Sequence, residues 1–145
     1  MNITYRQMKI EDIEKVIPLF IEYWNSTGDK WTYDTTYRRI RQVVDSYDSY
    51  CMLAFCNNEI VGFAMGRFET FFDLTAYDLA EIIIASKYQN KGIGTSFMTV
   101  LEQNVKQMGA SMVQLLSVND ELHKHFYGKL GYNDCKNLKI KAKSL

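Results

Sequence analysis

The stretch that decides the fold is Gln89-Asn90-Lys91-Gly92-Ile93-Gly94, which follows the most apolar run of the chain and opens a long amphipathic segment. The preceding run, Leu-Ala-Glu-Ile-Ile-Ile at residues 79–84, predicts a strand buried on both faces. Apolar residues then recur at helical spacing over residues 92–108, and Gly109 is suited to end that helix. A glycine loop between a strand and a helix can bind an anion, because the first helical turn leaves backbone N–H groups unpaired and carries positive partial charge.

The loop does not match the two best-known phosphate motifs. A Walker A loop needs Gly-Lys-Ser/Thr after its spacer, and a dinucleotide fingerprint needs a third glycine where Phe97 stands. Gly92 and Gly94 would still let a pyrophosphate approach the backbone, and Lys87 and Lys91 would add positive charge at its rim. Two glycines before a helix are also compatible with a simple turn, so the loop alone does not assign a ligand.

The remaining pattern predicts further strands and helices around this unit. Strands are expected at residues 2–7, 50–55, 60–68, 112–118, 132–136 and 138–142, and helices from residue 11, at 37–46 and at 120–130. Asn57-Asn58 suits a tight hairpin turn between two of the strands, whereas Pro18 is expected to remove a hydrogen bond from the first helix. The order predicts one α/β domain over residues 1–145, without repeats or linkers.

Composition limits the classes of function. Seventeen basic and seventeen acidic residues cancel, so no overall charge attracts nucleic acid or an anionic membrane. No apolar run resembles a signal sequence or a membrane span, which predicts a cytoplasmic protein. The three cysteines match no zinc motif, and His123 and His125 would diverge on a helix, so no metal is expected.

Two motifs together resemble a known family. Gln-x-x-Gly-x-Gly at residues 89–94, after a buried strand, resembles the phosphate-binding motif of the GNAT superfamily of N-acetyltransferases. Phe-Tyr-Gly-Lys-Leu-Gly-Tyr at residues 126–132 looks like the second signature of that family. The whole chain is similar to a minimal GNAT domain, which implies a mixed, mostly antiparallel sheet with a parallel pair at its middle and helices on both faces.

The resemblance also implies a cofactor, acetyl-CoA, and residues that hold it. The loop amides would bind the CoA pyrophosphate: Gln89, Asn90, Lys91, Gly92, Ile93, Gly94 and Thr95. The preceding strand would pair its backbone with the pantetheine arm along Ile82, Ile83 and Ile84. Asn119 is like an asparagine that contacts pantetheine in the family, but its spacing to the second motif is one residue longer than the commonest pattern. Asp120 occupies that commoner position, and either side chain could instead cap the helix.

Two residues are the candidates for catalysis. Tyr127 matches the family tyrosine that protonates the departing thiolate, a role suited to a phenol that is protonated at neutral pH. Glu81 is the candidate base for the acceptor amine, because a carboxylate among isoleucines on a buried strand needs a partner or a function. The alternatives are that Tyr127 only packs, that Glu81 is structural or anchors substrate, and that Glu69 is the base instead.

The acceptor side is expected to come from the segments outside the motifs. Trp31, Tyr33, Phe71 and Phe72 would form a pocket wall, and Asp73 would attract a cationic amine. These aromatics are equally compatible with a core or a dimer interface, and both a monomer and a homodimer remain open. The resemblance therefore implies acetyl transfer to a primary amine of a small molecule or peptide, and we expect direct attack in a ternary complex. The alternatives are a silent acyl-CoA sensor and a purely structural interaction domain.

Overall fold

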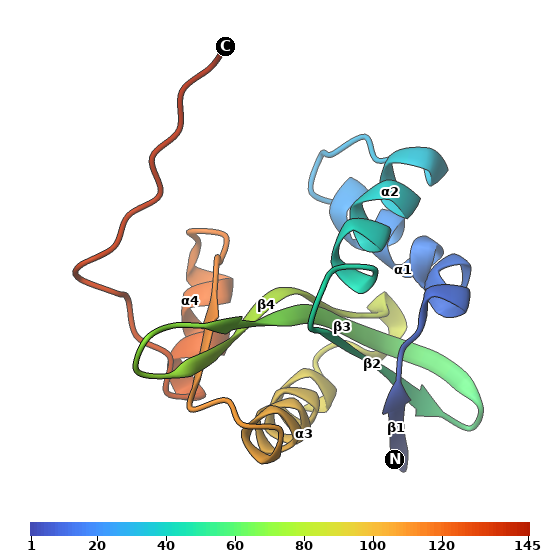
Figure 1. Cartoon of the computed structure of the whole chain (residues 1–145). Coiled ribbons are helices and arrows are strands. Elements are labelled where there is room, and N and C mark those ends of the chain that lie inside the picture. Colours follow the sequence, from blue (N-terminus) through green and yellow to red (C-terminus); the bar gives the residue numbers. More distant parts are fainter.

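The computed structural model describes all residues, 1–145, and its centre is one five-stranded sheet (Figure 1). The strands follow chain order across the sheet: β1 (Ile3–Gln7), β2 (Ser49–Cys56), β3 (Glu59–Thr70), β4 (Thr75–Ile84) and β5 (Met112–Leu115). Every neighbouring pair is antiparallel except β4 and β5, which are parallel. Asn57 and Asn58 both have positive φ in the β2–β3 hairpin, as that tight turn requires.

Helices cover both faces of this sheet (Figure 1). They are α1 (Ile13–Asn25), α2 (Tyr33–Val44), α3 (Ile93–Gln107) and α4 (Glu121–Lys129), with short 3-10 turns η1 (Ile10–Asp12) and η2 (Ser86–Tyr88). Helix α1 continues through Pro18 without a break. None of the four helices combines the length and apolar character needed to cross a membrane.

Each face of the sheet has its own apolar core. Ile13, Phe20 and Ile40 of α1 and α2 pack against Phe63 and Ile83 on one side. On the other side, Phe97, Leu101 and Val105 of α3 pack against Tyr77 and Leu79. The predicted three-layer α/β architecture is therefore confirmed, because a sheet buried on both faces needs helices on both.

An opening between β4 and β5 positions the candidate site. Pairing of these strands runs from Ala76–Met112 to Leu79–Leu115, whereas β4 continues to Ile84. The β3–β4 register also shifts at Met65/Gly66, so that Ala80 is an extra residue on β4. This bulge changes which face the following residues occupy: Leu79 and Ile82 pack on the α3 side, and Ile83 packs on the α1–α2 side.

The predictions for the end of the chain were wrong. The predicted strands at residues 132–136 and 138–142 are absent; residues 133–145 are exposed and extend from the body (Figure 1). Leu138 and Ile140 are 65% and 68% exposed, and two apolar residues among lysines bury too little area to offset the entropy of ordering a strand. The parallel pair consequently lies at the edge of the sheet rather than at its middle.

Other boundaries moved because tertiary contacts extend the elements. Strand β4 begins at Thr75, before the predicted run at residues 79–84, because its pairing with β3 extends to Thr70–Thr75. Strand β5 ends at Leu115 rather than at residue 118, and α2 begins at Tyr33 because the Thr32 side chain accepts the N–H of Thr35 as an N-cap.

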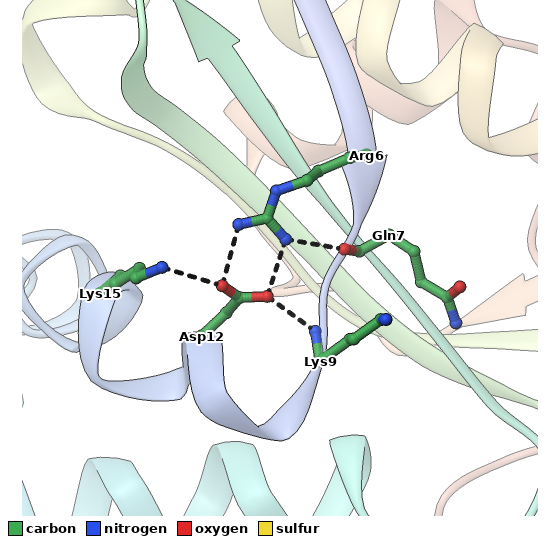
Figure 2. Close-up of polar contacts among 5 residues, drawn as sticks. All are labelled: Arg6, Gln7, Lys9, Asp12 and Lys15. Atoms are coloured by element: carbon green, nitrogen blue, oxygen red, sulfur yellow. Dashed lines mark hydrogen bonds and ion pairs between the residues drawn. The ribbon is translucent and has the colours of Figure 1, made fainter.

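A buried carboxylate fixes the junction between β1 and α1 (Figure 2). Asp12, only 3% exposed, accepts two hydrogen bonds from the Arg6 guanidinium at 2.9 Å, with the Lys9 N–H at 2.9 Å and Lys15 Nζ at 3.2 Å. These bonds hold the pKa of Asp12 well below its usual range, Arg6 being the largest cause. The cluster ties the first strand to the helix that carries part of the site.

Candidate active site

A cleft of about 470 Å³ lies where β4 and β5 separate. Its walls combine apolar residues of both strands with polar and aromatic side chains from α1, α2, β4 and α4. These are Tyr23, Trp24, Arg39, Glu81, His123 and Tyr127. Elements far apart in the sequence therefore meet at one hollow, which is the usual form of a small-molecule site.

The loop between β4 and α3 has the free donors expected of an anion site. The backbone N–H groups of residues 90–95 donate to no acceptor within the chain. Asn90 and Gly92 have φ values of 60° and 77°, and the Gln89 side chain donates to the Ile84 carbonyl at 2.9 Å, which holds the loop against the strand. Unpaired amides at a helix N-terminus beside an unpaired strand edge fit the pyrophosphate and pantetheine of CoA.

Gly94 has a packing role as well. A Cβ at this position would lie 3.3 Å from the Phe126 ring and 3.7 Å from Ile84, so glycine allows α4 to approach the loop closely. The two family-like motifs are thus in contact through Gly94 and Phe126. Lys91 is exposed at the loop, but Lys87 is held by Glu59 at 2.8 Å, which leaves it less available to an anion than expected.

Tyr127 reaches the cleft from α4 and packs edge-to-face against Phe126 and Tyr132. Its hydroxyl has no hydrogen-bond partner in the chain, so a ligand can be its acceptor. Burial raises the pKa of Tyr127 to about 12, and the neighbouring Tyr23 and Glu81 add to the shift. The phenol therefore stays protonated at neutral pH, as a proton donor must.

Glu81 faces the cleft from β4, and its side chain is 13% exposed. Trp24 Nε1 donates to one carboxylate oxygen at 3.2 Å, and Arg39 pairs with the other at 3.4 Å. Burial raises the pKa of Glu81, whereas Arg39 and Trp24 oppose that rise by favouring the ionised form. The carboxylate thus has partners on α1 and α2, and its role as the base stays a prediction.

A hydrogen-bonded chain that the sequence interpretation missed enters the same cleft. Asp120 caps α4 by accepting the His123 N–H at 2.8 Å, and the same Oδ1 lies 2.7 Å from His123 Nδ1. His123 Nε2 lies 3.2 Å from the Tyr23 hydroxyl on α1. The spacing Asp-x-x-His at a helix start was a usable signal for the first bond, but the contact with Tyr23 spans 100 positions and depends on the fold.

Asp120 rather than Asn119 therefore caps α4. Asn119 is exposed in the turn before the helix, and its cofactor contact stays a prediction. Glu69 pairs with Arg67 at 3.2 Å near the end of β3 and does not line the cleft. No three potential metal ligands gather anywhere in the chain.

The residues expected to bind the acceptor are not brought together at the cleft. Trp31 packs on Phe20 with ring centroids 4.8 Å apart, and Tyr33 is half-exposed at the start of α2. Phe71, Phe72 and Asp73 lie in the exposed β3–β4 turn, where Phe72 makes almost no contact with the chain. Their role in acceptor binding stays a prediction, whereas Tyr23, Trp24 and Arg39, which were not among the predicted site residues, line the cleft.

Most of the chain is similar to a known protein family. The model of the acetyltransferase (GNAT) family matches residues 13–132, from the start of α1 to the end of the second motif. The chain belongs to this family. A curated relative, uncharacterized protein YxbD of Bacillus subtilis (strain 168), is 36% identical over 90 residues, or 61% of this GNAT chain and 52% of YxbD. The GNAT chain thus spans about half the length of the curated relative it matches.

Solved structures share the fold of this GNAT protein. A possible acetyltransferase from Clostridium difficile 630 has a TM-score of 0.84 at 12% identity, over 100% of this chain and 99% of its own. The aminoglycoside acetyltransferase meta-AAC0020 from an uncultured soil metagenomic sample, solved in complex with sisomicin, has a TM-score of 0.77 at 15% identity, over 99% and 96% of the two chains. At these identities the likeness shows the fold alone.

Proposed function

We propose that this protein transfers an acetyl group from acetyl-CoA to a primary amine by direct attack in a ternary complex. The observation that carries the proposal is an unbonded Tyr127 hydroxyl in a cleft at the unpaired part of β4, together with the free amides of the loop that follows the same strand. Family membership supports acetyl transfer in general. The acetyl donor and the class of acceptor are the proposed parts.

The loop, the edge of β4 and the cleft each have a role in this proposal. When bound, acetyl-CoA supplies the acetyl group as an activated thioester. Residues 90–95 would hold its pyrophosphate, and Ile82 to Ile84 would pair with its pantetheine arm. Tyr127 holds a proton at its hydroxyl for the sulfur that leaves, and Glu81 presents a carboxylate to the ammonium form of the acceptor.

The acceptor is proposed to be a small amine or an exposed amine of a peptide. A cleft of about 470 Å³ that opens to solvent admits one amine-bearing group together with the end of a pantetheine arm. The solved sisomicin complex of meta-AAC0020 makes aminoglycosides one class to test. A silent acyl-CoA sensor would keep the loop amides, but it would have no use for a proton donor in the cleft.

The test combines thiol release with calorimetry. Acetyl-CoA is offered with sisomicin, spermidine, L-lysine and a peptide with a free N-terminal amine, and free CoA thiol is measured, while acetyl-CoA alone is titrated in a calorimeter. We expect binding of acetyl-CoA and turnover with one amine class. Binding without turnover for any amine would support the sensor, and absence of binding would overturn the proposal.

A further inference from the structure

The chain Asp120–His123–Tyr23 has a direction set by its hydrogen bonds. The Asp120 carboxylate can only accept, so a neutral His123 donates from Nδ1 across the 2.7 Å contact. Its Nε2 then carries a lone pair, and that lone pair lies 3.2 Å from the Tyr23 hydroxyl. Tyr23 must therefore be the donor in this bond, which makes the chain a path along which a proton can move from the cleft to the histidine.

The ends of the chain are suited to take up and release a proton. Tyr23 lines the cleft beside Trp24, the donor to Glu81, and burial is the main cause that raises the pKa of Tyr23, so its phenol stays protonated and passes protons on. The His123 side chain is 19% exposed and Asp120 is 45% exposed, which gives the histidine contact with water. Hydrogen bonds from His123 hold the pKa of Asp120 below its usual range, so the carboxylate remains charged next to an imidazolium.

Burial raises the pKa of Glu81, but its hydrogen bonds leave it less free to take the proton. Both of its carboxylate oxygens already accept hydrogen bonds, from Trp24 and Arg39, and each bond stabilises the charged form that a base must give up. Tyr23 and His123 have no competing cation among their partners. Glu81 would therefore bind the ammonium group of the acceptor, and Tyr23 with His123 would accept its proton.

We propose that Tyr23 and His123 deprotonate the acceptor amine, with Asp120 as the residue that positions the imidazole. An ammonium N–H bond breaks and its electron pair stays on nitrogen, while the proton passes to the Tyr23 oxygen. The original hydroxyl proton of Tyr23 moves to Nε2 of His123, and the resulting imidazolium releases a proton to water. The inference rests on the proposed acetyl transfer, since it assigns the proton of that reaction's acceptor.

The other ionisable groups around this chain come from α2, α4, β3 and β4. They are Tyr127 on α4, Glu81 and Asp78 on β4, Arg39 on α2 and Arg67 on β3. Two of these, Glu81 and Asp78, are carboxylates, and the test includes Glu81 because it is bonded to Trp24, the neighbour of Tyr23.

The first experiment is a pH profile of kcat/KM between pH 6 and 9.5, with whichever amine of the panel turns over. His123→Gln and Tyr23→Phe are compared with His125→Gln, which changes the exposed histidine two positions along the same helix. Without an internal proton acceptor, only the free amine reacts, and its fraction rises about tenfold per pH unit up to a pKa near that of lysine. We expect His123→Gln and Tyr23→Phe to lose about 100-fold at pH 7 and to recover most of that loss at pH 9.5, and His125→Gln to follow wild type.

A second readout needs no acceptor. Because the chain contains only two histidines, 15N NMR of the imidazoles resolves both, and we expect the Nδ1–H tautomer for neutral His123 but not for His125. An Nε2–H tautomer at His123, an unaltered pH profile in His123→Gln, or the alkaline recovery appearing in Glu81→Gln instead would each overturn the inference. Failure of acetyl transfer itself is distinct, because wild type would then release no thiol with any amine.

Discussion

At the scale of single residues, the side chains of the cleft differ in the number of hydrogen bonds that they already make. Both carboxylate oxygens of Glu81 already accept a hydrogen bond, from Trp24 and Arg39, whereas the Tyr127 hydroxyl contacts no acceptor of the chain. A polar group left unbonded at the wall of a cleft is available to a ligand. This contrast makes Tyr127 the sharpest single-residue test of the chemistry.

We expect Tyr127→Phe to lower kcat by about 100-fold while it changes the affinity for acetyl-CoA less than twofold, because only the proton donor is lost. Since the pKa of Tyr127 is raised to about 12, the phenol stays protonated throughout the working range, and wild type should show no alkaline loss of activity from this group below pH 10. Steady-state thiol release measures kcat, and calorimetry measures the affinity for acetyl-CoA. Equal kcat in the variant would assign Tyr127 to packing alone.

Gly92 offers a matched pair that isolates charge at the loop. Its φ is 77° and no atom lies within 4 Å of a Cβ built there, and asparagine and aspartate both tolerate this region. We expect Gly92→Asp to bind CoA at least about tenfold more weakly than Gly92→Asn in calorimetry, because like charges placed together cost several kcal/mol. Equal affinities would place the pyrophosphate elsewhere. Gly94 is a poorer test, since any side chain there would also displace Phe126.

At the scale of elements, the Arg6–Asp12 cluster joins β1 to α1 and so supports the helix that carries Tyr23 and Trp24 (Figure 2). We expect Asp12→Asn to lower the free energy of unfolding by about 1–3 kcal/mol at pH 7, measured by urea denaturation. The exposed Arg41–Asp45 pair supplies the control, since Asp45→Asn should change stability by less than about 0.5 kcal/mol. Equal effects of the two substitutions would show that burial of Asp12 is unimportant.

The lowered pKa of Asp12 predicts how the free energy of unfolding depends on pH. The folded pKa of Asp12 lies below its unfolded value of about 3.9, so its contribution is fully present above that value and is lost as the pH falls below it. Wild type should therefore lose more stability than Asp12→Asn between pH 5 and pH 3. Parallel curves for the two proteins would contradict this assignment.

At the scale of the whole molecule, the exposed segment after α4 is the clearest feature to test. Residues 134–145 make no hydrogen bond to the sheet, and their removal leaves the Tyr132–Glu102 bond of 2.6 Å in place. We expect a chain ending at Asn133 to keep the free energy of unfolding within about 0.5 kcal/mol of the full chain. A larger loss would mean that this segment adds strands to the sheet, as its alternating pattern predicts.

The sequence by itself determined the local features of this protein. The isoleucine-rich strand, the glycine loop and the amphipathic α3 were all predictable, because each depends on hydrophobic period or backbone freedom within a few residues. The loop and the second motif were also sufficient to indicate the GNAT family. Tyr127, named from its match to the family motif, and Glu81, named as a carboxylate among isoleucines, both line the cleft.

Only the tertiary structure decided which distant side chains meet. Contacts between elements separated by up to 100 positions build the site. They are the bulge at Ala80, the bonds of Glu81 to Trp24 and Arg39, and the contact of Tyr23 with His123. Hydrophobic period carries no information about such contacts, because they depend on how helices are placed over a twisted sheet. The strand prediction for the final segment was wrong because local alternation is not sufficient. A strand forms only where its backbone pairs with a neighbouring strand and its apolar face packs against a core.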